Sequence, residues 1–123
     1  MLFNLDLFNK SIPFNLPINL NFTKMNINNF KINVAIQLLP TKCTTDKIEL
    51  IDKAIACIKA SGLKHIVCPF ETVVEGTYKE IFDLVDLIRT TTLNNGCEEL
   101  LVNMKMHAGS KDLFFEDKLA KYS

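Results

Sequence analysis

The two histidines and four cysteines are the side chains best suited to metal binding or nucleophilic catalysis in this sequence. His65 and Cys68 have the H-x-x-C spacing of a pair of metal ligands. In a strand, however, residues three apart point to opposite faces, so we expect structural roles for both. His107 falls near the end of another predicted strand, and no carboxylate stands at a fixed spacing from it. We expect His107 to be an exposed side chain without a catalytic role. The sequence therefore predicts no metal site and no catalytic residue.

The cysteines Cys43, Cys57, Cys68 and Cys97 form no C-x-x-C pair and no zinc-ribbon pattern. The sequence also has no phosphate-binding glycine loop, no G-x-S-x-G elbow and no H-E-x-x-H motif. Because no secretory signal is recognisable, we expect four reduced thiols in a cytoplasmic protein, with a disulfide pair as the less favoured alternative. We expect no enzyme activity and no cofactor.

The composition indicates one small globular domain. The chain has 123 residues, of which 48% are hydrophobic, so it can bury a packed hydrophobic core. The 14 Lys and Arg residues equal the 14 Asp and Glu residues, and this balance argues against a nucleic-acid or anionic-membrane partner. No apolar run approaches the roughly 20 residues of a membrane-spanning helix.

The first 29 residues differ in composition from the rest of the chain. Asparagine alternates with Phe and Leu in this stretch, and prolines interrupt any regular element. We interpret residues 1–29 as a poorly ordered leader or a mis-assigned start, with Met25 as an alternative first residue. A β-arm over residues 18–22 is the other interpretation. Residues 30–123 read as one complete domain.

The domain begins with a strand and a helix. Residues 32–38 alternate apolar and polar side chains, which predicts a half-buried strand that Pro40 ends. Thr44 or Thr45 is expected to cap the following helix, and Gly62 is the expected left-handed stop. The apolar stripe of this helix consists of Ile48, Ile51, Ile55 and Ile58.

A hairpin, a second helix and a last strand follow. The hairpin strands are predicted at 65–68 and 71–75. Thr77 and Glu80 form a capping box, in which each side chain can bond the other residue's backbone N–H. The remaining predicted elements are a helix that ends at Asn94–Gly96, a strand at 99–107 and a short terminal helix at 114–122.

This β-α-β-β-α-β order predicts an α+β, ferredoxin-like fold, in which a four-stranded antiparallel sheet carries two helices on one face. Nothing else in the chain is an obvious cover for the other face, which we call the open face. Met104 and Met106 are expected to be ordinary strand core on the helix side. The side chains expected on the open face are Asn33, Ala35, Gln37, Leu39, Glu71, Val73, Glu75, Leu101, Asn103, Lys105 and His107. Their mixed chemistry is typical of a subunit interface or a small polar ligand site, and a solvated sheet face is the alternative.

Several segments together resemble the YkoF-like family of small thiamine-binding proteins. The most telling is a P-x-x-T-x-x-E-G hairpin strand that leads directly into a capped helix. The likeness covers about residues 32–121. The segments that carry it are Asn33–Pro40, Ala60–Leu63, Pro69–Gly76, Phe115–Lys118, and the positions of Gly96 and Lys105.

The resemblance implies a ferredoxin-like fold, homodimers or homotetramers assembled through the sheets, and non-catalytic binding of thiamine or its hydroxymethylpyrimidine half. By motif, it implies that Gln37, Thr72 and Glu75 hydrogen-bond an aminopyrimidine. Phe70 would give an aromatic wall, and Glu71 would balance a thiazolium charge.

The sequence departs from the family pattern at two loops. Thr41–Lys42 stand where a glycine is common, and His107–Gly109 replace a common D-x-R stretch. If these two loops line the binding pocket, the ligand can differ from that of other family members even when the fold is the same. Glu75–Gly76 can equally be a strand end that feeds a capped helix. The alternative function is a structural or regulatory homo-oligomer whose open face is only a subunit interface.

Overall fold

Four strands form one antiparallel sheet in the computed structural model, which describes residues 27–122. The spatial order is β2-β3-β1-β4, with β1 at Lys31–Cys43, β2 at Lys64–Val67, β3 at Thr72–Thr77 and β4 at Cys97–His107. The helices are α2 at Lys47–Ser61, α3 at Tyr78–Leu93 and α4 at Phe115–Leu119, with 3-10 turns η2 at Ile27–Asn29 and η3 at Ala120–Tyr122. The predictions for the leader, including Met25 and the β-arm, concern residues that lie outside this description except at 27–29.

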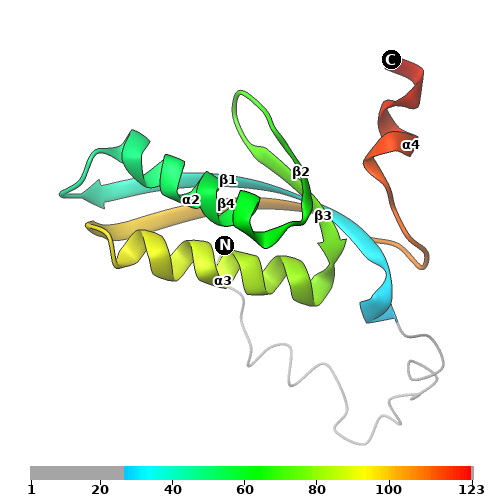
Figure 1. Ribbon diagram of the computed structural model, residues 1–123, viewed down its shortest axis with the longest axis horizontal. Coiled ribbons are helices and arrows are strands. Elements are labelled where there is room, and N and C mark those ends of the chain that lie inside the picture. The colour runs from blue at the N-terminus through cyan, green and yellow to red at the C-terminus, as the bar shows by residue number, and fades with distance from the viewer. Residues whose placement is uncertain (1–26, 123) are drawn as a thin grey trace, which may run out of the picture.

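The predicted fold class is confirmed. Helices α2 and α3 lie together on one face of the sheet, and the connections follow the ferredoxin-like order (Figure 1). The core lies between them. Its buried members are Ile32, Val34, Ile36 and Val74 from the sheet and Ala54, Ile58, Ile81, Leu84 and Ile88 from the helices.

The start of α3 and the end of α2 are both fixed by local capping residues. Thr77 Oγ1 accepts from the Glu80 N–H at 3.3 Å, and Glu80 Oε1 accepts from the Thr77 N–H at 3.0 Å, so the capping box is confirmed. Gly62 adopts φ +73° at the end of α2, where a side chain would be strained. These caps fix the start of α3 directly after β3.

The start of α2 differs from the prediction. Asp46 is the N-cap, and its carboxylate accepts from the Ile48 N–H at 3.0 Å. Thr44 and Thr45 are not caps, because their hydroxyls donate to carbonyls of the α3–β4 loop at 3.3 and 2.8 Å. Ile48 is 67% exposed instead of part of the apolar stripe, since the buried residues of α2 begin at Leu50.

Strand β1 is longer than predicted, because Pro40 does not end it. Pro40 pairs with Leu100 of β4, and the strand continues with bulges to Cys43. Strand β3 pairs with β1 only as far as Ile36, so the other edge of β1 has no neighbouring strand at Pro40. A residue without an N–H can therefore occupy this position with no ladder bond lost on that side.

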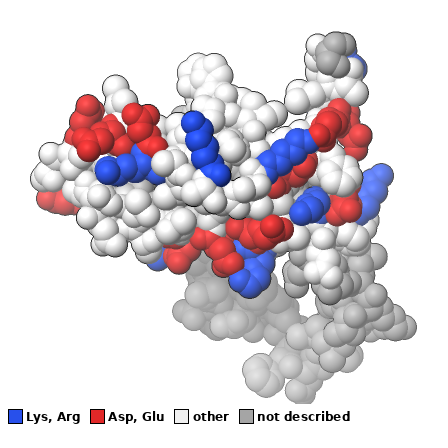
Figure 2. All heavy atoms as spheres, viewed as in Figure 1, with Lys and Arg blue, Asp and Glu red and all other residues white. Residues whose placement is uncertain are grey.

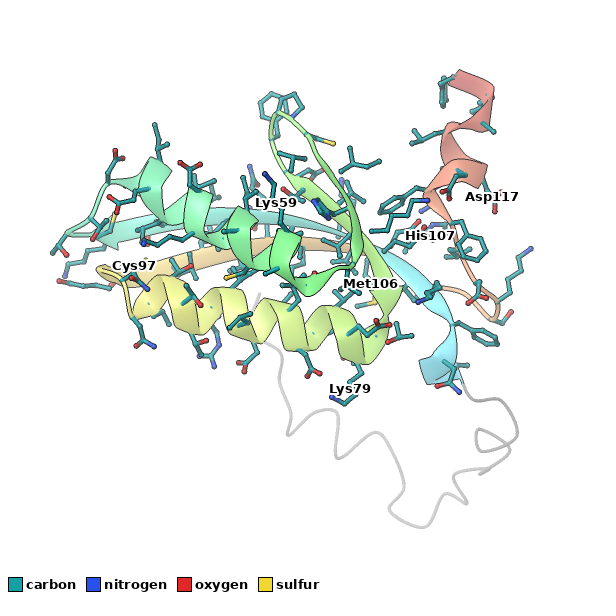
Figure 3. All side chains as sticks on the ribbon, viewed as in Figure 1. Lys59, Lys79, Cys97, Met106, His107 and Asp117 are labelled. Carbon is teal, nitrogen blue, oxygen red and sulfur yellow. The ribbon has the colours of Figure 1, made fainter. Side chains whose placement is uncertain are left out.

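The methionines of β4 are another correction. Met104 and Met106 pair with core residues of β1 and face the helix side, as expected from parity. They are not core, however, since they remain 37% and 44% exposed. Strand β4 is one of the two edge strands of the sheet, and Met106 lies near its C-terminal end (Figure 3). Among residues 27–122, no helix is both long and apolar enough to cross a membrane.

Candidate functional site: a cavity beneath the hairpin turn

A cavity of about 150 Å³ lies between the β2–β3 turn, helix α2 and the middle of β1. We call it the hairpin cavity. Ile36 and Leu38 contribute from β1, and Ile51, Ala54 and Ile55 line it from α2. The turn that covers it is closed by a hydrogen bond of 2.8 Å from the backbone N–H at residue 68 to the carbonyl at residue 71. The lining is thus mainly apolar, as is typical of small-molecule sites.

Four of the five predicted site residues line this cavity: Gln37, Phe70, Glu71 and Thr72. The register brings them together. Thr72 is the first residue of β3 and pairs with Ile36. Strand β1 continues past this pair, so Gln37 lies just beyond the start of β3. Phe70 and Glu71 come from the turn itself.

Thr72 is the polar residue most enclosed by this cavity. It is 6% exposed, and its partner Ile36 belongs to the core on the helix side of the sheet. Its hydroxyl has no hydrogen-bond partner among the residues that the structure describes. The fully buried side-chain oxygen without a partner in residues 27–122 is Asn33 Oδ1, so the Thr72 oxygen keeps some access from the cavity and is available to a ligand.

The other polar groups of the cavity also have free hydrogen-bonding capacity. Gln37 Oε1 accepts from Asn103 Nδ2 at 3.2 Å, which leaves the Gln37 amide N–H groups without a partner in the described part of the chain. The half-buried Glu71 carboxylate likewise has none within residues 27–122. Phe70 is 82% exposed at the tip of the turn. The cavity therefore offers a carboxylate acceptor and a hydroxyl beside an aromatic ring, and Gln37, whose side chain bonds Asn103 on the open face, lies at its edge.

Glu75 lies apart from the hairpin cavity. It is 8% exposed on the open face, where its Oε1 accepts from the Phe115 N–H at 2.6 Å and from Asn33 Nδ2 at 3.4 Å. Lys64 Nζ lies 4.0 Å from the other carboxylate oxygen. We call Asn33, Lys64, Glu75 and Phe115 the C-terminal cluster. Its polar groups bond mainly with one another, although Asn33 Oδ1 is buried without a partner among the described residues.

The C-terminal segment covers this end of the open face, contrary to our expectation that nothing in the chain would. Asn33 Nδ2 donates to the Leu113 carbonyl at 3.1 Å, and the Leu113 N–H donates to the Lys31 carbonyl at 3.0 Å. The Asp112 carboxylate accepts from the Lys31 N–H at 2.7 Å. Lys64 forms an ion pair with Glu116. Helix α4 thus lies at the end of the sheet where β1 begins (Figure 1).

Neither histidine lies in the hairpin cavity. His65 Nδ1 lies 2.8 Å from the Leu63 carbonyl, and His107 is exposed at the end of β4 (Figure 3). Within residues 27–122, no three His, Cys, Asp or Glu side chains come together in a way that could hold a metal ion. Acidic and basic side chains are interspersed over the face shown in Figure 2.

Sequence reasoning did not identify the apolar residues that line the cavity or the hydrogen bonds that hold the C-terminal segment on the sheet. Ile51 and Ile55 were assigned to the core stripe, yet they are only partly buried and line the cavity. Asn33 was expected on the open face and Phe115 belongs to a family-like segment, but the contacts that hold the C-terminal segment could not be predicted because they join residues 40 to 80 positions apart.

The fold and the cavity define a ferredoxin-like domain with a single-ring-sized pocket at its hairpin turn. The chain belongs to the Thiamine-binding protein family, which matches residues 34–123.

Sequence and structure comparisons agree with this assignment. A UPF0045 protein of Clostridium perfringens is 27% identical over 90 residues, which are 73% of this chain and 95% of that protein. A domain of unknown function from Bacillus cereus superposes with a TM-score of 0.74 at 26% identity and covers 80% of this chain and 95% of that one. A Thermotoga maritima protein, described as a candidate thiamine biosynthesis/salvage protein, gives a TM-score of 0.69 at 28% identity, with 76% and 99% coverage.

Proposed function

We propose that this protein is a non-catalytic, cytoplasmic binding protein for thiamine or its hydroxymethylpyrimidine half, with the hairpin cavity as the site. The observation that carries the proposal is the Thr72 hydroxyl, which lines a mainly apolar cavity and has no hydrogen-bond partner among the described residues. Family membership supports the ligand class. So does the description of the Thermotoga relative.

The size of the cavity favours one aromatic ring. An engineered apolar cavity of about 150 Å³ in another protein holds benzene, and the hairpin cavity has about the same volume. An aminopyrimidine has N–H donors beside ring-nitrogen acceptors. The Glu71 carboxylate can accept from the amino group, while Gln37 and Thr72 can donate to ring nitrogens. Phe70, at the exposed tip, would then face a thiazolium that stays outside the cavity.

We assign Glu75 a different role from the one that the motif implied. Its carboxylate already accepts two hydrogen bonds, one of them from the backbone of Phe115. In this proposal Glu75 holds the C-terminal segment and makes no contact with the ligand. The four residues that contact the ligand are Gln37, Phe70, Glu71 and Thr72.

Calorimetric titration with thiamine and with hydroxymethylpyrimidine tests the proposal. We expect saturable heat with at least one of them, and about 2.7 kcal/mol of added stability when the ligand stands at about 100 times its Kd. No heat and no thermal shift at millimolar ligand would contradict it. Mass spectrometry of the ligand after incubation should show an unchanged molecule, because no bond is made or broken.

We also propose that protomers assemble through the open face as a homodimer or homotetramer. Leu39 and Leu101 pair across β1 and β4 on this face and are 36% and 51% exposed. The C-terminal segment covers only the opposite end of the sheet. Light scattering on the full chain should give the mass of a dimer or tetramer, and Leu101→Lys should reduce it to that of a monomer. A monomeric wild-type protein would contradict the assembly but leave the ligand proposal standing.

A further inference from the structure

Two of the four free cysteines face each other at the end of the sheet opposite the C-terminal cluster. Cys43 is the last residue of β1, Cys97 is the first residue of β4, and the two are Cα partners in the antiparallel ladder. Cys97 lies beside the start of α2 (Figure 3). The pair is therefore close in space although 54 positions separate it in the sequence.

The hydrogen bonds around the pair define its geometry. The Thr44 N–H donates to the Gly96 carbonyl at 2.8 Å, one step outside Cys43 and Cys97. Opposed residues flanked by such a bond form a non-hydrogen-bonded pair, whose Cα atoms lie about 4.5 Å apart with the side chains close together. Disulfides span Cα distances of about 4.4–6.8 Å. The register thus places the two Cα atoms in the range of a disulfide, and the Cys97 thiol, which donates to the Glu99 carbonyl at 3.1 Å, would leave that bond to form one.

Neighbouring contacts hold this geometry in place. Thr45 Oγ1 donates to the Asn95 carbonyl at 2.8 Å, and Lys42 Nζ lies 3.0 Å from Glu98 Oε2. Gly96 adopts φ +95°, and a Cβ there would collide with the Thr45 hydroxyl, so the close approach of the two loops requires glycine at this position. A disulfide would need little further ordering of the chain, which is the condition under which it forms without strain.

The two thiols differ in access to solvent. Cys97 is 4% exposed, and burial together with the neighbouring Cys43 raises its pKa. Cys43 is only partly buried, so it is the thiol that a reagent meets first. The remaining two cysteines serve as internal controls. Cys57 contacts Thr91 between the helices, and Cys68 lies in the hairpin turn.

We propose that Cys43 and Cys97 are a redox-sensitive pair that closes a reversible disulfide across β1 and β4. The oxidant is a small-molecule disulfide. The Cys43 thiolate attacks one of its sulfurs, which forms a mixed disulfide and releases the first small thiol. The Cys97 thiolate then attacks the Cys43 sulfur and releases the second. The protein loses two electrons and two protons, and the reagent becomes two thiols.

The bond would tie the residue before the β1–α2 loop to the start of β4. The closed loop contains α2, the hairpin and α3, so the bond would restrict the elements that line the hairpin cavity together with β1. Such a crosslink stabilises a protein mainly by restricting its unfolded chain. This inference does not depend on the identity of the ligand.

The test equilibrates the full chain with graded ratios of oxidised to reduced glutathione. We expect an intact mass lower by two hydrogens, a crosslinked peptide that joins Cys43 to Cys97, and a thermal midpoint about 10 °C higher than that of the reduced protein. The double variant Cys57→Ser/Cys68→Ser should behave in the same way. Cys43→Ser and Cys97→Ala should each lose the crosslink.

Because Cys97 is buried, its variant can fail to fold, and the partly exposed Cys43→Ser keeps the test valid. The proposal is overturned if the wild-type protein yields only glutathione adducts, only crosslinks between chains, or a bond that involves Cys57 or Cys68. Unchanged mass at the most oxidising ratio would overturn it as well.

Discussion

The hairpin cavity and the C-terminal cluster both hold polar side chains against the sheet, but they use them in opposite ways. In the C-terminal cluster, the Glu75 carboxylate accepts from Phe115 and Asn33 of the same chain. In the hairpin cavity, the Thr72 hydroxyl and the Glu71 carboxylate have no partner in the described part of the chain.

This difference separates a structural role from a binding role. Buried polar groups are nearly always paired, because an unpaired one costs about 1–3 kcal/mol. The carboxylate that pairs within the chain is therefore best explained by stability. The unpaired groups of the hairpin cavity are accessible and can therefore bond a ligand, whereas the fully buried unpaired oxygen of residues 27–122, Asn33 Oδ1, lies in the C-terminal cluster. Substitutions at the two places should accordingly affect different measurements.

The largest effect on stability is expected at the C-terminal cluster. Glu75→Ala removes the acceptor of a buried backbone N–H and should lower the free energy of unfolding by about 2–3 kcal/mol. Urea denaturation measures it. Glu71→Ala is the matched control, since this carboxylate has no partner in residues 27–122, and it should change stability by less than about 0.5 kcal/mol.

The same two variants should have the reverse order of effect on ligand affinity. Glu71→Ala should weaken binding, while Glu75→Ala should leave the Kd of the folded protein within about threefold, or roughly 0.7 kcal/mol. If Glu75→Ala abolished binding in protein that is still folded, the distinction between the two regions would fail.

The next largest effect is expected at Thr72. Thr72→Val keeps the shape of the side chain and removes only the hydroxyl, so ligand affinity should fall about tenfold, or roughly 1.4 kcal/mol. Stability should stay equal or rise, because an unpaired hydroxyl leaves an apolar cavity. Thr41→Val, also on a strand but exposed and outside the cavity, is the control for calorimetry. Equal affinity in both variants would argue against the site.

A smaller effect is expected from Gln37→Ala. It removes amide donors from the cavity and should weaken binding by about 1 kcal/mol, with the assembly mass unchanged in light scattering. A face that serves only as an interface would give the opposite result, namely loss of assembly.

The smallest effect concerns a carboxylate that is paired but exposed. Hydrogen bonds from Thr77, its backbone N–H above all, and the nearby Lys31 hold the pKa of Glu80 below its ordinary 4.5. The stability that this provides is present above pH 4.5 and is lost as the pH falls below that value. Solvent screens the interaction, so Glu80→Gln should cost only a few tenths of a kcal/mol at pH 7.

Thermal melts between pH 3 and 7 measure this dependence, and the variant should lose less stability over the acidic part than the wild type. If Glu80→Gln lowered the free energy of unfolding as much as Glu75→Ala does, the expected difference between buried and exposed carboxylates would be wrong.

Local signals predicted most of the fold. Alternation assigned Ile32, Val34 and Ile36 to the core, and the capping box and Gly62 fixed helix ends, because each rests on neighbours within four residues. Predictions failed where distant residues intervened. Thr44 and Thr45 bond a loop about 50 positions away, which left the cap of α2 to Asp46.

The candidate site was predictable to a similar extent. The hairpin motif brought Phe70, Glu71 and Thr72 together because they are consecutive, and the family motif added Gln37, which parity alone had placed on the opposite face from Thr72. The position of Glu75 on the other face followed from the same parity, since it lies three residues after Thr72. Its partner Phe115 is 40 positions away, and no local pattern reveals such a contact.

A crystal structure of the protein with hydroxymethylpyrimidine would show whether the hairpin cavity is the binding site. We expect the ring inside this cavity, with the Thr72 hydroxyl and the Glu71 carboxylate bonded to its nitrogens and Glu75 still bonded to Phe115. A ring seated against Glu75 beneath a displaced C-terminal segment, with the hairpin cavity empty, would contradict this expectation.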